Sequence, residues 1–401
     1  MLRMLKRCAA LMLLSALMLG GLPRASAKTV EEWLEGFETG ETWFGEDFAY
    51  DITDEEACWE LLQRPITVLD AGQREEIYPR VTPGGEKVND DKLGGFINGA
   101  SAAMHVLGED EDGWTLIEGL DYYNRVIRGY VKTSLLKTVT PNDKYGVIID
   151  KLTQRLYVFI DGKLWSSCAV STGLPNKDQP YNETAAGEYL IGSWVGGFDS
   201  EGMYCEMGIR FNGGDLLHQV PYVEFADGTK DFSKYGSQLG RKASHGCVRV
   251  ARTANDEGLC ISWLWENLKK NTKVVVWDDD GRTLPYPDDD LEVYYNPDGG
   301  TSYHATATCR SVRDKYLPLT AFTYGELDSG KYASLTGCTN CIPVKRHAEI
   351  DEINQERIDL GELLKNPVYT GGATTGGGAQ AEGSAASDSP EASDGVTITI
   401  R

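Results

Sequence analysis

A thiol and two imidazoles occur close together in the part of the chain that is most suggestive of chemistry. Residues 244–249 read Ser-His-Gly-Cys-Val-Arg, and a further histidine, His218, lies upstream in a strand-like run that ends at Pro221. Cysteine attacks a carbonyl carbon as its thiolate, and histidine is the side chain best suited to accept the thiol proton near neutral pH. These residues predict acyl chemistry in which Cys247 attacks and His218 and His245 are candidate bases.

The elements around these residues must bring them together. The residues before the motif are typical of a loop, whereas residues 248–250 alternate like a strand, so His245 and Cys247 would share one face. Gly246 between them would let a substrate carbonyl approach the backbone. The amides of residues 245–247 would then form an oxyanion hole. Only folding would bring the upstream histidine to the thiol.

The string at 244–249 resembles the signature of the YkuD-type L,D-transpeptidases. This resemblance sets it apart from most Cys-His pairs, which are structural. The four residues after His218, Gln-Val-Pro-Tyr, also look like that family. In the family an upstream histidine on a neighbouring strand is the general base. The resemblance therefore implies that His218 is the base and that Cys247 is the nucleophile.

Other residues of the two motifs are expected around the substrate. The resemblance places Arg249 near the substrate carboxylate, where it either binds that group or packs the loop. Ser244 is expected to be structural or to donate an orienting hydrogen bond, and His245 to orient the cleft. Tyr222, the last residue of the family-like run after His218, completes the expected substrate-binding set.

The resemblance covers residues 140–279, with further family-like stretches at 171–173 and 184–189. It implies a mainly-β fold, a YkuD-type β-sandwich with the cysteine in a cleft. One departure is the spacing between the upstream histidine and the Ser-His-Gly-Cys run, which is longer than is usual in the family. The extra residues, 224–231, are polar and contain glycine, so we expect them to form a lengthened lid over the cleft.

The function that the resemblance implies is that of a secreted peptidoglycan L,D-transpeptidase acting on stem peptides. Cys247 would form a thioester, and an amine of another stem would resolve it to a 3→3 cross-link, with no cofactor for catalysis. Attack by water instead would make the enzyme an L,D-carboxypeptidase. Two further alternatives are a non-catalytic cell-wall-binding protein and a structural envelope protein that uses residues 293–346. The intact His218, His245 and Cys247 set argues against a pure binding protein, which has no use for a free thiol.

The N-terminus predicts export. Three basic residues precede an apolar run at 9–19 and an Ala-Ser-Ala sequence at 25–27, the pattern of a signal peptide over residues 1–27. The apolar run is short for a bilayer span, so we expect no membrane span after cleavage; an uncleaved anchor is the alternative. The protein would then lie in the cell envelope, in the cell wall or the periplasm. A net charge of −22 argues against nucleic acid or anionic lipid as partners.

Two segments are expected before the catalytic unit. Residues 28–63 read as helical, with a short amphipathic helix beginning at Asp54. Residues 64–139 alternate in short strands between turns and resemble bacterial SH3-like β-barrels. Such barrels often bind cell-wall peptides, and a structural spacer is the alternative. The expected strands lie at residues 66–69, 102–107, 114–118 and 128–131, and His105 is expected to be a core or surface residue of the barrel.

A small Cys/His-rich module is expected at residues 293–346, after an acidic linker at 279–292. Its four candidate metal ligands have the spacing of a tetrahedral zinc site, and the stretch resembles the metal-binding domain of a bacterial DNA-repair methyltransferase: His304, Cys309, Cys338 and Cys341. A disulfide among the three cysteines is the alternative in a secreted protein. Cys168 and Cys260 lie in apolar patterns and are expected to be buried free thiols. Residues 366–401 read as a disordered tail.

Overall fold

The computed structural model describes residues 48–363, with these gaps: 73–74, 89–94, 98–101, 110–111, 123, 177–178 and 201. The expected signal peptide at 1–27, the first part of the helical segment at 28–63 and the tail at 366–401 lie outside the described residues. Among the described helices, none has both the length and the apolar character that a membrane crossing needs.

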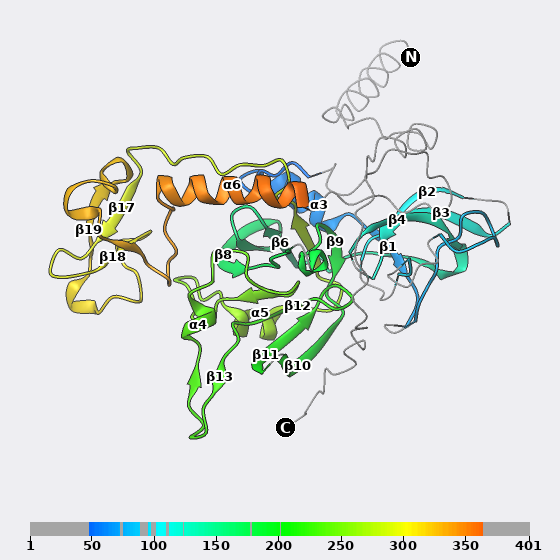
Figure 1. The fold of residues 1–401 in the computed structure, drawn as a ribbon, viewed down its shortest axis with the longest axis horizontal. Coiled ribbons are helices and arrows are strands. Elements are labelled where there is room, and N and C mark those ends of the chain that lie inside the picture. Colours follow the sequence, from blue (N-terminus) through cyan, green and yellow to red (C-terminus); the bar gives the residue numbers. More distant parts are fainter. Residues whose placement is uncertain are drawn as a thin grey trace, which may run out of the picture. The chain divides into compact units, whose positions relative to one another are not determined.

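A nine-stranded sheet forms the middle of the chain (Figure 1). The pairs β12/β15 and β6/β16 are parallel, and the other neighbours are antiparallel. In spatial order the strands are β10 (Ser193–Ser200), β11 (Met203–Arg210), β12 (Leu216–Gln219), β15 (Val248–Val250), β8 (Lys163–Ser171), β7 (Arg155–Ile160), β6 (Tyr145–Asp150), β16 (Lys273–Trp277) and β9 (Gly187–Leu190).

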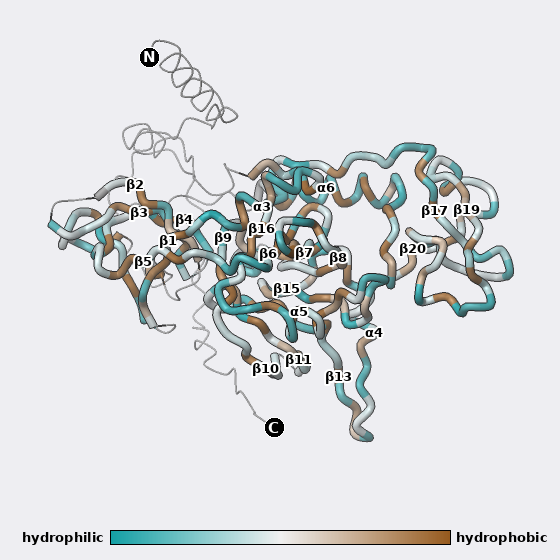
Figure 2. The backbone as a smooth tube through the Cα atoms, turned by 180° about the vertical axis from the view of Figure 1, so that it is seen from behind, coloured by the Kyte–Doolittle hydropathy of each residue, from teal (hydrophilic) through white to brown (hydrophobic). Residues whose placement is uncertain are grey.

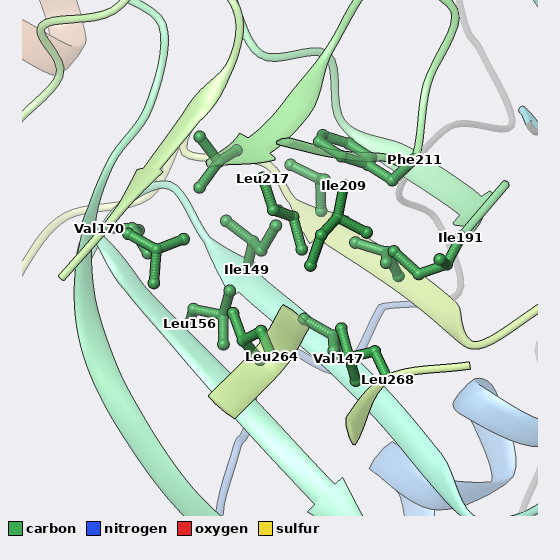
Figure 3. Close-up of a cluster of buried hydrophobic side chains, with 14 of the residues drawn as sticks. Val147, Ile149, Leu156, Val170, Ile191, Ile209, Phe211, Leu217, Leu264 and Leu268 are labelled. Carbon is green, nitrogen blue, oxygen red and sulfur yellow. The ribbon is translucent and has the colours of Figure 1, made fainter. Parts of the chain in front are cut away.

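Both faces of this sheet are packed. Val147 and Ile149 of β6 lie in the larger core, with side chains from β7, β8, β11, β12, β15 and the helix α5 (Ile261–Asn267) (Figure 3). Ile148, between them, belongs to a second core on the opposite face. Successive strand residues project to opposite faces, so a strand packed on both reads as a continuous apolar run. Figure 2 shows this hydrophobic colouring along β6, β7 and β16.

The sheet curls around its larger core. Tyr189 of β9, at one end of the strand order, contacts the ring of Phe211, which directly follows β11 near the other end. Their ring centroids are 5.5 Å apart, edge to face. The prediction of a mainly-β catalytic unit is confirmed, and the expected strand at 273–277 is β16.

The helix α3 (Glu55–Gln63) covers the second face of the sheet. Its side chains Leu61 and Leu62 are buried against Ile148 and Val275. The side chain of Asp54 accepts a hydrogen bond from the backbone N–H of Ala57 at 3.0 Å, which satisfies one of the unpaired amides of the first turn. The prediction that a helix begins at Asp54 is therefore confirmed.

Residues 64–139 form a small β unit with its own core. Its core side chains include Leu69, Met104, Ile117 and Ile127. One expected strand is shifted, because residues 102 and 104 make only isolated bridges, with Tyr189 and Thr67. One sheet has two strands, β1 (Ile66–Leu69) and β5 (Leu136–Val139). A second sheet has β2 (His105–Glu109), β3 (Trp114–Leu120) and β4 (Val126–Lys132). A 3-10 helix, η1 (Thr133–Leu135), lies between β4 and β5. His105 lies in β2, half-buried, and the SH3-like assignment stays a prediction.

The C-terminal part has a four-stranded sheet and a long helix. Seven buried apolar side chains form its core. The elements are β19 (Thr320–Thr323), β17 (Glu292–Tyr295), β18 (Ser302–His304) and β20 (Thr336–Gly337) in spatial order, with η3 (Asp314–Tyr316), η4 (Tyr324–Glu326), η5 (Gly330–Tyr332) and α6 (His347–Leu363). The helix α6, orange in Figure 1, was not expected from the sequence.

Candidate active site

The parallel pairing of β12 with β15 brings the upstream histidine to the cysteine motif. Leu217 is in register with Val248, and His218 with Arg249. The first pair lies in the larger core, so the second pair projects from the opposite face. Cys247 directly precedes β15 and is half-buried; its sulfur has a hydrogen bond from the backbone of Leu216 in β12. The imidazole is therefore carried by the strand that lies next to the one that Cys247 precedes.

The His218 imidazole is buried and neutral. Its Nδ1 lies 2.7 Å from the backbone oxygen of Gln219. A carbonyl oxygen only accepts, so Nδ1 carries the proton and donates it, which leaves Nε2 as the basic nitrogen. Burial lowers the pKa of His218 to about 4, and the nearby Arg249 charge also disfavours protonation. An edge-to-face contact with the ring of Phe198, with 5.4 Å between the ring centroids, helps to hold the orientation of the imidazole.

The Cys247 thiol is protonated at rest. Burial and the charge of Asp215 raise the pKa of Cys247 to about 12, against smaller opposing effects of the Leu216 backbone and Arg210. Burial also raises the pKa of Asp215 itself to about 7. The resting pair of thiol and imidazole is therefore neutral, and the thiol needs a base at the moment of attack.

Hydrogen bonds hold the turn that presents the cysteine. The Ser244 hydroxyl donates to the backbone oxygen of Cys247 and accepts from the Gly246 N–H at 3.3 Å. The Thr184 hydroxyl donates to the Gly246 oxygen at 2.6 Å and accepts from the Gly173 N–H at 2.8 Å. These hydrogen bonds are consistent with the structural or orienting role expected of Ser244, and they engage the Gly246 amide, one of the three expected in the oxyanion hole. Thr184 was expected only as part of a family-like stretch.

Gly246 is required by the backbone itself. Its φ of +121° lies in a region that other residues rarely adopt. A Cβ added there would lie 2.6 Å from a carboxylate oxygen of Asp215. Asp215 was not singled out from the sequence, because no local pattern shows that the start of β12 lies against this turn.

Arg249 and Tyr222, expected at the substrate, are both buried. The Arg249 guanidinium donates to Gln238 Oε1 at 2.6 Å and lies over the ring of Tyr235 at 5.3 Å. Of the two roles that the sequence left open for Arg249, these contacts match packing of the loop. The Tyr222 hydroxyl donates to Glu206 Oε1 at 2.9 Å. The His245 side chain, in contrast, is exposed beside Cys247.

The inserted residues 224–231 form a hairpin. Its strands are β13 (Val223–Glu224) and β14 (Lys230–Asp231), and a short helix, α4 (Ser233–Gly236), follows. Phe225 beside its turn is 53% exposed, and Figure 1 shows the ribbon extending away from the sheet. Lys230 anchors its base through a 2.7 Å ion pair with Glu206. The interpretation of this hairpin as a lid stays a prediction.

A buried ion network includes the loop just before the turn at residues 244–247. Lys242, two residues before Ser244, contacts Glu183 at 3.0 Å and Asp279 at 2.9 Å. Arg357 of α6 contacts the same Asp279 at 2.6 Å. The carboxylates of Glu183, Asp278 and Asp279 lie close enough together for a metal ion, but Lys151, Lys242 and Arg357 already neutralise them. The network links helix α6 to the loop that precedes Cys247, which no sequence pattern indicated.

The four expected metal ligands of the C-terminal module do come together. Their ligand atoms all lie within 4.8 Å of one another, so the cluster could hold a metal ion. The sulfurs of Cys309 and Cys338 are 3.8 Å apart, which is too far for a disulfide, and all the cysteines of the described part are free thiols. The disulfide alternative is thus not formed in this structure. Cys168 and Cys260 are buried free thiols, as expected.

The comparisons with known proteins bear on the middle of the chain. Residues 144–276 match the YkuD family, described as an L,D-transpeptidase catalytic domain. No curated protein matches the chain.

Similar solved structures include three L,D-transpeptidases. That of Mycobacterium smegmatis is 14% identical over 44% of this chain and 82% of that chain, with a TM-score of 0.27. That of Mycobacterium tuberculosis H37Rv is 18% identical over 44% and 77%, with a TM-score of 0.27. That of Stackebrandtia nassauensis is 24% identical over 34% and 56%, with a TM-score of 0.24, so this chain spans just over half its length. Through its family match, the chain carries a YkuD L,D-transpeptidase catalytic domain at residues 144–276.

Proposed function

We propose that this protein is an exported peptidoglycan L,D-transpeptidase that forms 3→3 cross-links through a thioester on Cys247. The observation that supports the proposal is the pairing of β12 with β15 inside the family match, because the neutral His218 lies in the strand next to the one that Cys247 precedes. The substrates would be the stem peptides of peptidoglycan.

In the first half-reaction Cys247 Sγ attacks the carbonyl carbon of the third stem residue, whose amide links it to D-Ala. His218 Nε2 accepts the thiol proton as the C–S bond forms. Because thiol and imidazole are both neutral at rest, proton transfer accompanies attack. The imidazolium then returns the proton to the D-Ala nitrogen, the C–N bond breaks, and a thioester remains. The backbone amides of His245 and Cys247 are the proposed donors to the oxyanion, since the Gly246 amide is engaged by Ser244.

In the second half-reaction a side-chain amine of another stem attacks the thioester carbonyl carbon. His218 accepts the amine proton, the C–S bond breaks, and the proton passes to the departing sulfur. A new amide joins the two stems and Cys247 is restored. Each step uses the thiol, imidazole and amides of this chain, and none is assigned to a cofactor. Water in place of the amine would release a tripeptide, the carboxypeptidase alternative.

The first test is intact mass spectrometry of the purified chain after addition of imipenem, a carbapenem that resembles the acyl donor. We expect one covalent adduct on the wild type, none on Cys247→Ala, and an unchanged adduct on Cys260→Ala, which removes a buried thiol elsewhere in the domain. An adduct that persists in Cys247→Ala, or no adduct on the folded wild type, would count against the proposal. Incubation with a tetrapeptide substrate then shows whether the product is a cross-linked dimer or a hydrolysed tripeptide.

Export belongs to the same proposal and is tested separately. The sequence at 1–27 has the three parts of a signal peptide, and a cell-wall substrate requires export. N-terminal sequencing of the protein from a secreting host should begin at Lys28. An intact Met1 on protein recovered with the membrane would favour the uncleaved anchor.

A further inference from the structure

We propose that His304, Cys309, Cys338 and Cys341 bind one Zn²⁺ ion, which holds the C-terminal module together. This inference concerns residues outside the catalytic domain and does not rest on the proposed transpeptidase reaction. It is carried by the geometry of the four donors, the contacts around their sulfurs and the small size of the module's core.

The distances within the cluster are those of a tetrahedron around zinc. Zinc with Zn–S bonds of about 2.3 Å and Zn–N bonds of about 2.0 Å holds two sulfurs about 3.8 Å apart and a sulfur and a nitrogen about 3.5 Å apart. The sulfurs of Cys309 and Cys338 are 3.8 Å apart, and Cys341 Sγ lies 3.7 Å from His304 Nδ1. Two opposite edges of the tetrahedron are therefore already in place.

The backbone around the cluster is built to hold thiolates. The N–H of Ala305 points to Cys341 Sγ at 3.3 Å, and the N–H of Asn340 points to Cys338 Sγ at 3.4 Å. Such N–H···S contacts stabilise a metal-bound thiolate and fix the ligand's direction. The hydroxyl of Ser311 lies 3.2 Å from Cys309 Sγ and 3.3 Å from Cys338 Sγ.

The ligands come from separate elements that the ion would tie together. His304 ends β18, and Cys338 directly follows β20, whose end is joined to β18 by a backbone hydrogen bond from Cys338 to the oxygen of Tyr303 at 2.9 Å. Cys309 comes from the loop after β18, and Cys341 from the turn closed by the N–H of Ile342 on the Cys338 oxygen. A core of seven buried apolar side chains is small for an independent fold, so a metal would supply the missing stability.

The donor set fits zinc better than a disulfide. A disulfide would use two of the three sulfurs and leave the third thiol and the buried His304 imidazole without a shared function. Four donors fill a tetrahedral shell and leave no open position for substrate, which is the pattern of a structural zinc site.

The test is metal analysis of the full chain purified without chelators. We expect one zinc per chain, and replacement by Co²⁺ should give the absorption of tetrahedral thiolate-bound cobalt. Cys309→Ser and Cys341→Ser should each weaken zinc binding at least tenfold in competition with a chromogenic chelator. Cys58→Ser is the matched control, because Cys58 is a buried thiol outside the cluster whose bond to the Asp51 oxygen a serine can keep.

Two results would overturn the inference. One is a wild-type chain that binds no zinc, either with all its thiols titratable or with a mass two hydrogens lower that indicates a disulfide. The other is undiminished zinc binding by the Cys309→Ser and Cys341→Ser variants. Should the variants fail to fold, the zinc content and cobalt spectrum of the wild type still decide the question. Acylation by imipenem is measured separately from zinc content, so the zinc site and the proposed transpeptidase reaction can each fail without the other.

Discussion

At the scale of single residues, Gly246 shows how backbone geometry limits this site. We expect Gly246→Ala to destabilise the fold by about 1–3 kcal/mol, since it strains a positive φ and drives a methyl group against Asp215. Acylation by imipenem should fall at least a hundredfold as the Cys247 turn shifts. Urea unfolding and acylation rates measure the two effects.

The control for this prediction is Gly228→Ala in the hairpin. Gly228 also has a positive φ, +82°, but a Cβ there meets open space. This variant should carry the strain alone and keep its acylation rate. Equal acylation by the wild type and Gly246→Ala would show that the close approach of Asp215 does not constrain the turn.

His218 makes stability depend on pH. Its pKa is about 4 in the folded chain and about 6.5 when unfolded, so between these values the unfolded chain binds more protons. Stability that is present above pH 6.5 is therefore lost as the pH falls toward 4, by about 3 kcal/mol from this residue. Asp215, with its raised pKa, acts in the opposite direction over part of this range.

Comparison with His218→Gln isolates the histidine contribution. The difference in unfolding free energy between wild type and variant, measured in urea at pH 7 and pH 4.5, should change by about 2–3 kcal/mol. A difference that does not vary with pH would mean that the imidazole is not buried as a neutral group. The variant should also lose imipenem acylation at pH 7, where the wild type has its base.

At the scale of elements, the hairpin of β13 and β14 is separable from the fold. Replacing residues 225–229 by a two-residue turn removes the exposed Phe225 and leaves the ion pair between Lys230 and Glu206. We expect unfolding free energy to change by less than about 0.5 kcal/mol. If the hairpin acts as a lid, the shortened chain should be acylated faster by imipenem. An unchanged rate would remove the lid interpretation.

How far the sequence predicts each element depends on how local its causes are. The strands β6 and β16 were foreseeable because apolar runs such as 273–277 make buried strands, and α3 because Asp54 caps it. The helix α6 was missed because its buried side includes Arg357, which reads as a surface residue until its partner Asp279 is known.

The same distinction applies to the candidate site. His218 and Cys247 could be proposed from the chain because their types and order are those that acyl chemistry needs, and their catalytic roles stay predictions. The residues that hold them could not: Thr184, Asp215 and Lys242 act through contacts with residues distant in sequence. Likewise, the sequence left two roles open for Arg249, and only its contact with Gln238 distinguishes them.

At the scale of the whole molecule, the catalytic domain depends on residues beyond its family match. The match ends at residue 276, yet Lys242 shares Asp279 with Arg357 of α6. Asn354 of the same helix exchanges two hydrogen bonds with the backbone of Leu284, at 2.7 and 3.0 Å. The helix thus completes an ion network that reaches the loop before Ser244.

Arg357→Gln tests this dependence. Removing one partner of a buried network should destabilise the chain by about 2 kcal/mol, because Asp279 keeps its contact with Lys242. Acylation by imipenem should slow about tenfold as the loop before Ser244 loosens. Arg310→Gln is the matched control: its ion pair with Asp256 is exposed, so its loss should change stability by less than about 1 kcal/mol.

A chain that ends at residue 346 separates the role of α6 from that of the module, because it keeps Arg346, which donates to three backbone oxygens of the module. It keeps the whole Cys/His cluster but removes Arg357 with its helix. The truncation and the Arg357→Gln substitution both remove the same ion pair with Asp279, so both should slow acylation by a similar factor. We therefore expect the truncated chain to be acylated about as slowly as Arg357→Gln and to retain its zinc. If imipenem acylated the truncated chain as fast as the wild type, the turn that carries Cys247 would be shown to keep its shape without α6.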